Sequence, residues 1–501
     1  MRICIVAEGC YPYTIGGMSS WVHGLIRSFP NQEFVILTIV ANRSQRGKFV
    51  YELPDNVTEV WELYLEDVDW SKRRRRRSRM NKKEYQALRS LLLGNQVEWE
   101  TLIDFFQKKR YSLNDLLMGE DFLDAVTELY MLEYSQIVFT DFLWTMRSIY
   151  LPLFTTLQMD IPKADVYHCL STGYAGVLGS MGRYLYDGRL LVSEHGIYTR
   201  EREEELLRSK WVKGIYKNIW IDQFRKMSKM VYDRAELVTS LYERARELQL
   251  ELECPLEKTR VIPNGVTVER FQNLLGKTDA EQDEIYIGAV FRVAPIKDVK
   301  TLIQAFGFAK EHDSRLKLWI MGPWDNEDKY AQECFDMVGI MEISDIIFTG
   351  RVDVREYYGK MDMMILTSIS EGQPLTILES FSAHKPVIAT DVGDCSGLIL
   401  GNEDGFGEAG IITHIMNVGE ITEAILTLAQ NPQIRIQMGE NGYRRVSEKY
   451  RMEDMLNSYG VIYRDFAGSK GLPWLEERIE LADVQSGNYS REVQDYGRNR
   501  R

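Results

Sequence analysis

Short apolar runs of strand length alternate with longer amphipathic stretches along most of the chain. In the first half these runs are Ile3–Ala7, Phe34–Val40, Val166–His168, Leu190–Ser193 and Leu237–Ser240. In the second half they are Ile285–Val290, Leu316–Met321, Ile346–Phe348, Met363–Leu366 and Val387–Ala389. Patterns of helical period lie between them, as at Met18–Ser28 and Thr301–Lys310. This alternation predicts an α/β protein with two parallel sheets, each covered by helices on both faces.

Residues 43–163 interrupt the alternation. They are rich in charge and contain long helical patterns such as Leu116–Leu132, so we interpret them as an insertion in the first domain. The basic run Lys72–Arg79 lies inside this insertion. A solvated loop is the simpler interpretation of the run, and contact of Arg73–Arg77 with anionic lipid headgroups or an acidic partner is the alternative.

Composition narrows the function classes. The chain has 501 residues and a net charge of −13, which argues against broad nucleic-acid binding. It has no apolar stretch of membrane-spanning length. The apolar part of Met1–Glu8 is too short for a signal peptide, because a charged residue follows it at Glu8. None of its six cysteines pair at metal-ligand spacing. We therefore expect a cytoplasmic protein with reduced cysteines and no zinc site.

The most informative motif is the stretch from Glu371 to Glu379. An apolar run precedes it and a helical pattern follows it, so Glu371 lies on a loop between a strand and a helix. Pro374 suits the first turn of that helix, and a helix N-terminus is a natural seat for phosphate. Two carboxylates beside a phosphate seat suggest a ligand with hydroxyls and phosphates, such as a nucleotide sugar. A helix start with two ordinary acids is the alternative.

Other polar or small residues follow predicted strands in both halves. Arg292 and Lys297 come after Ile285–Val290, where a fork of two cations could hold a diphosphate, although two surface cations would give the same pattern. Gly16 and Gly17 offer backbone that a ligand can approach, or simply a turn. His195 follows another apolar run, and a buried or capping histidine is its commoner role.

Together these motifs resemble the retaining glycosyltransferases of family 4, which have the GT-B fold. The resemblance covers roughly residues 1–42 and 164–465, and its most specific parts are Glu371 with Glu379 and Arg292 with Lys297. The segment Pro263–Val266 is also typical. The opening from Ala7 to Trp21, with the large insertion, is more narrowly similar to the PelF glycosyltransferases of Pel-type exopolysaccharide synthesis.

The resemblance implies an architecture. Two Rossmann-like, doubly wound domains would face a central cleft, with the insertion in the N-terminal domain. The N-terminal acceptor domain would span residues 1–275 and the nucleotide-sugar-binding domain residues 276–450. Residues 451–501 would form a helix, about Met452–Ala467, that crosses back to the first domain, followed by a polar tail.

The resemblance also implies roles for individual residues. Glu379 would bind the ribose hydroxyls, and Glu371 would face the donor sugar. Arg292 and Lys297 would hold the diphosphate, and His195 would sit near the anomeric centre. Further contacts, largely through backbone, would come from Gly16, Gly17, Thr349, Gly350, Arg351, Val352, Gly372, Gln373, Pro374, Leu375 and Thr376.

The function that follows is transfer of a hexose or N-acetylhexosamine from a UDP-sugar to a growing polysaccharide, in Pel-like exopolysaccharide synthesis. Its partners would be the donor, the glycan acceptor and polysaccharide-synthesis proteins of the inner membrane. The rival interpretations are a UDP-sugar 2-epimerase, which shares the fold, and a non-catalytic nucleotide-sugar-binding scaffold. The Glu371–Glu379 motif with its cation pair favours transfer over epimerisation.

No metal or cofactor is expected. Asp67 and Asp69 have the Asp-x-Asp spacing by which another glycosyltransferase fold holds a divalent metal. Here they lie in the irregular insertion instead of ending an apolar strand, so we interpret them as ordinary surface acids.

Overall fold

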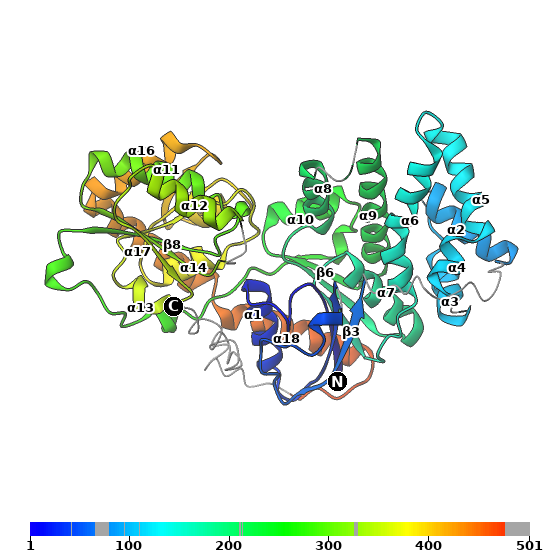
Figure 1. The fold of residues 1–501 in the computed structure, drawn as a ribbon. Coiled ribbons are helices and arrows are strands. Elements are labelled where there is room, and N and C mark those ends of the chain that lie inside the picture. The colour runs from blue at the N-terminus through cyan, green and yellow to red at the C-terminus, as the bar shows by residue number, and fades with distance from the viewer. Residues whose placement is uncertain are drawn as a thin grey trace. The chain divides into compact units, whose positions relative to one another are not determined.

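The computed structural model describes residues 1–41, 43–65, 80–94, 96–109, 111–209, 212, 214–324 and 329–475. It divides the chain into two compact units, coloured along the chain in Figure 1. The first comprises Met1–Val261 and the chain from Tyr459 onward, and the second comprises Ile262–Ser458. The basic run Lys72–Arg79, Asp67, Asp69 and the end of the polar tail lie outside the described residues.

The first unit is built on a parallel sheet. Within the described residues it has seven strands in the order β3-β2-β1-β4-β5-β6-β7. Their bounds are β1 Arg2–Glu8, β2 Glu33–Val40, β3 Val57–Tyr64, β4 Val166–Cys169, β5 Arg189–Glu194, β6 Leu237–Ser240 and β7 Thr259–Val261. The central strand β1 pairs with β2 on one side and β4 on the other, and its residues Ile3–Ala7 are fully buried. Such continuous apolar runs are typical of a strand covered on both faces.

The helices of the first unit alternate with its strands along the chain, as in a doubly wound fold. They are α1 Gly17–Arg27, α7 Tyr174–Tyr186, α8 Tyr198–Arg208, α9 Ile215–Arg234 and α10 Glu243–Glu251. The helix α7 packs against the strands and against α9. Short 3-10 turns lie at Arg43–Gln45 and Leu256–Lys258.

The structure corrects the interpretation of residues 43–163. Part of this range belongs to the sheet itself, because β3 pairs along its length with β2. Most β3 residues are half-buried, so β3 lacks the apolar run that marks the inner strands. The inserted part is helical and comprises α2 Lys82–Leu93, α3 Trp99–Lys109, α4 Leu113–Leu117, α5 Glu120–Leu129, a π-helical turn Tyr130–Tyr134 and α6 Phe139–Leu157.

The single helix predicted over Leu116–Leu132 is wrong. Helix α4 ends at Leu117, and α5 starts only after Gly119, whose backbone is extended. Glycine disfavours a helix interior, which gives the interruption its physical reason. The buried faces of these helices, including Phe122 and Phe154, join the apolar core of the first unit.

The second unit repeats the architecture. In the described chain its sheet has six parallel strands in the order β10-β9-β8-β11-β12-β13. These are β8 Ile285–Val290, β9 Leu316–Met321, β10 Ile346–Gly350, β11 Met363–Leu366, β12 Val387–Thr390 and β13 Gly410–Thr413. The helices are α11 Val299–His312, α12 Lys329–Ile340, α13 Arg355–Tyr358, α14 Leu375–Ser382, α15 Cys395–Leu400, α16 Val418–Gln430 and α17 Pro432–Lys449.

These helices cover both faces of the second sheet. Helix α11 packs against α12 and α16, and α14 packs against α17, as Figure 1 also shows. The side chains between them form a separate core that includes Ile287, Leu318 and Phe381. The two parallel sheets, each doubly wound, confirm the α/β class and the two Rossmann-like domains predicted from the sequence.

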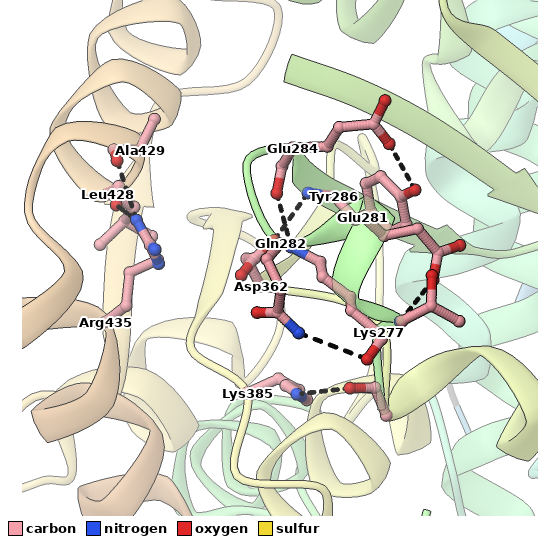
Figure 2. Close-up of polar contacts among 12 residues, drawn as sticks. Lys277, Glu281, Gln282, Glu284, Tyr286, Asp362, Lys385, Leu428, Ala429 and Arg435 are labelled. Carbon is pink, nitrogen blue, oxygen red and sulfur yellow. Dashed lines mark hydrogen bonds and ion pairs between the residues drawn. The ribbon is translucent and has the colours of Figure 1, made fainter. Parts of the chain in front are cut away.

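The second unit starts earlier than residue 276, the boundary expected from the sequence. Val266, Val268 and Phe271 already belong to the apolar core of this unit. Figure 2 shows how the chain just before β8 is held. The Lys277 ammonium contacts the Asp362 carboxylate and donates to the Glu284 carbonyl at 2.6 Å, while Asp362 also accepts from the backbone N–H of Tyr286 at 2.7 Å. These contacts attach the incoming chain to the amino ends of β8 and β11.

The last described helix, α18 Met452–Ser469, passes from the second unit into the first at Tyr459. Its tyrosines enter a buried polar network in the first unit. His168 shares hydrogen bonds of 2.7 Å with the Tyr463 hydroxyl and with the Ser193 hydroxyl, which in turn lies 3.0 Å from the Tyr459 hydroxyl. This network explains how the helix end is held on the first sheet.

All six cysteines are buried free thiols. Of the helices that the structure describes, none is both long enough and apolar enough to cross a membrane.

Candidate nucleotide-sugar site

The predicted site residues of the second unit gather at one edge of its sheet. The strand order reverses direction between β8 and β11, which pair in parallel through Met363 and Ile287. In open α/β sheets the carboxyl ends of strands at such a switch point form the ligand-binding crevice. The loops that leave β8 and β11 carry Arg292, Lys297 and Glu371.

The loop after β8 is tied to the chain that leaves β11. The Thr367 hydroxyl donates to the Lys297 carbonyl at 3.0 Å, and the Ile369 N–H donates to the Ile296 carbonyl at 2.8 Å. A 3-10 turn over Pro295–Lys297 then leads through Asp298, whose φ of +47° is left-handed, into α11. This turn presents Lys297 at the strand edge, whereas the side chain of Arg292 is exposed.

Lys297 and Glu371 form a direct ion pair across this edge. The ammonium donates to the Glu371 carboxylate, and the two side chains are 23% and 13% exposed. The structure therefore brings together two residues predicted to act on the donor, although they lie 74 positions apart. A cation and an anion held side by side can contact a phosphate and a sugar hydroxyl of one ligand.

Helix α14 begins beside this pair. Pro374 occupies the N-cap, one position before the first turn in which it was predicted, and α14 runs from Leu375 to Ser382. The Thr376 hydroxyl donates to the Val290 carbonyl at 3.3 Å, which joins the first turn to the end of β8. The unpaired N–H groups of a helix start attract an anionic ligand group.

Glu379 lies a little over one turn into α14 and is half-buried. Burial raises the pKa of its carboxyl to about 7, against the opposing effects of Arg270 and of the Tyr358 hydroxyl, which donates to Oε2 at 3.4 Å. The carboxyl is thus poised near neutral pH between donor and acceptor forms. Sequence reasoning missed Arg270 and Tyr358, and no local pattern marks either one.

Gly350 ends β10, and Arg351 and Val352 follow it. Gly350 has a left-handed φ of +70°, and its carbonyl accepts from the Gly322 N–H at 2.9 Å. The positive φ favours glycine there. Arg351 is exposed, while Val352 packs against the core. This group therefore lies at the same carboxyl edge, with β9 and β8 between its strand and β11.

The remaining predicted residues belong to the first unit. Gly16 precedes α1 with an extended φ of 172°, and a Cβ there would meet nothing within 4 Å. Its conformation and surroundings therefore do not by themselves demand glycine. Gly17 is the first residue of α1.

His195 follows β5 and stands edge-on to the Trp21 ring, with 4.5 Å between ring centroids. Burial lowers the pKa of its imidazole to about 4, so the ring is neutral at physiological pH. Among the described residues its Nε2 has no hydrogen-bond partner. A neutral imidazole with a vacant nitrogen can exchange a hydrogen bond with a ligand hydroxyl, but it does not supply positive charge.

Asp394 is a buried residue of this edge that sequence reasoning missed. It follows β12 and accepts from the Gln373 Nε2 at 2.7 Å. Its signal was present, since it comes shortly after the apolar run Val387–Ala389, as Arg292 and Glu371 come shortly after theirs. Within the described parts of the chain, no group of three or more His, Cys, Asp and Glu side chains is arranged to hold a metal ion.

The sequence of the first unit matches a known protein family. Residues 1–257, just over half of the chain, match the family described as Domain of unknown function (DUF3492). The chain belongs to this family. In this DUF3492 protein, residues 282–431 also match the family described as Glycosyl transferases group 1. Its second unit therefore carries a group 1 glycosyl transferase domain.

Curated relatives of the DUF3492 chain are distant. A capsular polysaccharide biosynthesis glycosyltransferase, CapM, from Staphylococcus aureus is 24% identical over 209 residues, which are 40% of this chain and 53% of the relative. A poly(ribitol-phosphate) alpha-N-acetylglucosaminyltransferase from Staphylococcus aureus (strain COL) is 22% identical over 237 residues, 47% of this chain and 46% of the relative. The chain thus spans about half the length of these relatives.

Solved structures similar to the DUF3492 chain establish its fold. Sucrose-phosphate synthase from Thermosynechococcus elongatus aligns with a TM-score of 0.59 at 15% identity, over 93% of this chain and 99% of that one. HepE from Anabaena, solved in complex with UDP, aligns with a TM-score of 0.59 at 14% identity, over 93% and 100%. These neighbours confirm the GT-B fold class that the sequence resemblance implied.

Proposed function

We propose that this protein is a UDP-sugar-dependent glycosyltransferase that moves a hexose or N-acetylhexosamine to a growing polysaccharide. The observation that carries the proposal is the Lys297–Glu371 ion pair at the switch point of the second sheet, beside the start of α14. The pair offers a cation for a diphosphate and a carboxylate for sugar hydroxyls at the edge where open α/β sheets bind ligands.

The comparisons support this function at three levels. The family model of the second unit is that of group 1 glycosyl transferases. The curated relatives are named as transferases of N-acetylglucosamine and as enzymes of capsular polysaccharide synthesis. HepE, which shares the fold, was solved with UDP and with UDP-glucose. A nucleotide-sugar donor and a glycan acceptor are the common chemistry.

Each predicted site residue of the second unit has a proposed role in binding the donor. Arg292 and Lys297 bind the diphosphate, and Glu371 accepts hydrogen bonds from the hydroxyls of the donor sugar. Glu379 accepts from the ribose hydroxyls, and backbone groups of Gly350–Val352 lie by the nucleobase. Backbone N–H groups at the start of α14 add to the binding of the phosphates.

The proposed reaction retains the configuration of the sugar. The acceptor hydroxyl enters on the face from which UDP leaves, and the leaving phosphate oxygen takes the acceptor proton. The bond between the anomeric carbon and the phosphate oxygen breaks as the new glycosidic bond forms. No protein base is required, so orientation and stabilisation of the phosphate charge lower the barrier.

Lys297 has a further part in this scheme. Its ammonium can shift part of its interaction from Glu371 to the phosphate as charge grows on the departing UDP. We further propose a metal-independent reaction without a cofactor, because Arg292 and Lys297 already provide positive charge there. We also propose a narrower role in Pel-like exopolysaccharide synthesis. In this role the protein would act with membrane partners and would contact the membrane through Arg73–Arg77.

The test is incubation of the full chain with radiolabelled UDP-glucose, UDP-N-acetylglucosamine and UDP-N-acetylgalactosamine. Transfer predicts UDP release together with label in a larger glycan. Label recovered as a C2 epimer of the donor would instead establish the 2-epimerase. Tight UDP-sugar binding with neither product would establish the non-catalytic scaffold. The Glu371→Gln variant is the matched negative control, since it keeps the size of the side chain and removes its charge.

A further inference from the structure

The side chain of Gln373 is buried and lies between two other buried polar side chains of the second unit. Gln373, Asn264 and Asp394 are 5%, 5% and 6% exposed. The backbone N–H of Asn264 donates to the Gln373 Oε1 at 2.7 Å, and the Gln373 Nε2 donates to the Asp394 Oδ2 at 2.7 Å. Both ends of the Gln373 amide are therefore used inside the protein and not at the ligand edge.

The backbone around Gln373 is held by the same two partners. The Asn264 Nδ2 donates to the Gln373 carbonyl at 3.1 Å, and the Asp394 N–H donates to the Gly372 carbonyl at 2.9 Å. The chain from Gly372 to Gln373 thus has four hydrogen bonds to two segments that are distant in sequence. The Asn264 segment precedes β8, and Asp394 follows β12.

The turn that carries Asp394 also packs closely on the loop. Gly393 has a φ of +56°, and a Cβ there would lie 2.3 Å from the carbonyl oxygens of Glu371 and Gly372. No side chain fits in that space, so the turn lies directly against the Glu371 backbone. The Glu371 side chain extends from this backbone to Lys297. A fixed backbone on one side and an ion pair on the other determine where the carboxylate is.

We propose that Gln373 is a positioning residue that fixes the Glu371 carboxylate for the donor sugar by tying its loop to Asn264 and Asp394. This inference rests on the proposed function. The loop needs such a tie because it has no strand or helix pairing of its own between β11 and α14. Displacement of a substrate-positioning group by about 1 Å can cost on the order of a hundredfold in rate.

Loss of the Gln373 tie is expected to affect transfer of the sugar and not binding of the nucleotide. Glu379, Arg292 and Lys297 bind the UDP part and are outside the network, so loss of the tie leaves the affinity for UDP nearly intact. A general loss of folding would instead lower UDP affinity and turnover together. The ratio of the two effects therefore distinguishes positioning from a merely structural role.

The experiment uses the full chain and three variants of the network. Gln373→Met keeps the side-chain length and removes both hydrogen bonds, Asp394→Ala removes the acceptor, and Asp394→Asn retains an acceptor oxygen. Asn441→Leu is the matched control, because it removes a buried amide of the same unit that bonds to the Glu408 carbonyl at 2.8 Å. Turnover is followed by UDP release from the UDP-sugar that the wild type uses, and UDP affinity by calorimetry.

Gln373→Met and Asp394→Ala are expected to lower turnover by about a hundredfold while the Kd for UDP changes by less than about threefold. Asp394→Asn should retain turnover within about threefold of wild type. The double variant that combines Gln373→Met with Asp394→Ala should lose no more turnover than either single variant. If Gln373→Met does not fold, the two Asp394 variants test the same contact.

Three results would overturn the inference. They are unchanged turnover in Asp394→Ala, a parallel loss of UDP affinity and turnover, and equal losses in Asp394→Asn and Asp394→Ala. A wild type that transfers no sugar and binds no UDP-sugar would refute the proposed function itself, and that outcome is visible before any variant is made.

Discussion

Glu379 is predicted to destabilise the protein above neutral pH, because its environment disfavours the ionised carboxyl. Burial raises the carboxyl pKa to about 7 from its ordinary 4.5. Between these two values the folded state holds a proton that the unfolded state has released. Stability therefore falls as pH rises through this window, and the full cost is reached above pH 7. Replacement by glutamine removes the titration and keeps an oxygen that can accept from Tyr358.

The magnitude follows from linkage. One pH unit of difference corresponds to about 1.4 kcal/mol, so the Glu379→Gln variant should be more stable than wild type by about 3 kcal/mol above pH 8. Near pH 5.5 the gain should shrink to about 1.4 kcal/mol, since this pH lies only about one unit above the pKa of the unfolded state and the cost grows by about 1.4 kcal/mol per pH unit up to the folded pKa. With a urea slope of about 2 kcal/mol/M for this unit, the midpoint should move by about 1.5 M at high pH.

The assay is urea unfolding of wild type and variant at a series of pH values between 5.5 and 8.5, with UDP calorimetry on the same samples. The exposed Glu356→Gln is the matched control and should show no pH-dependent gain. If Glu379 binds ribose, the variant is both more stable and weaker for UDP, as expected when a functional group is held in a costly environment. A stability gain that is equal at pH 5.5 and 8.5 would refute the reasoning.

Three further predictions concern single groups. Lys297→Ala should lower turnover on the order of a hundredfold with little change in the Michaelis constant; a raised Michaelis constant at unchanged turnover would mean that Lys297 only anchors the nucleotide. Activity should persist in excess EDTA, and loss that magnesium or manganese restores would refute the metal-independent scheme. Arg445→Met should destabilise the second unit by about 3 to 5 kcal/mol, measured by urea unfolding, because the buried guanidinium binds Asp404 at 2.7 and 3.1 Å. Adding Asp404→Leu should recover part of this loss, and a fully additive double variant would contradict the pairing.

Much of the fold follows from the sequence because its inner strands are buried on both faces. Runs such as Ile3–Ala7 and Ile285–Val290 must be apolar throughout, so the pattern marks them without reference to the rest of the molecule. The edge strand β3 has no such constraint and was hidden within the supposed insertion. The break at Gly119 was instead a local signal that the apolar pattern passed over, since glycine disfavours a helix interior.

The candidate site likewise has a part that the sequence predicts and a part that depends on the fold. Its chemistry could be predicted, because Arg292, Lys297, Glu371 and Glu379 follow strands whose ends must share one edge of the sheet. The pairing of Lys297 with Glu371 was decided by the order of β8 and β11, which brings together residues far apart along the chain.

The polar supports of the site were decided only by tertiary structure. Asn264, Gln373 and Asp394 come from three distant segments, and nothing in their local sequence shows that these residues share hydrogen bonds. The same holds for the raised pKa of Glu379, which arises from burial by neighbours and not from its position in the motif. Periodicity and strand ends are properties of short segments, whereas burial and hydrogen bonding between segments exist only once the chain has folded.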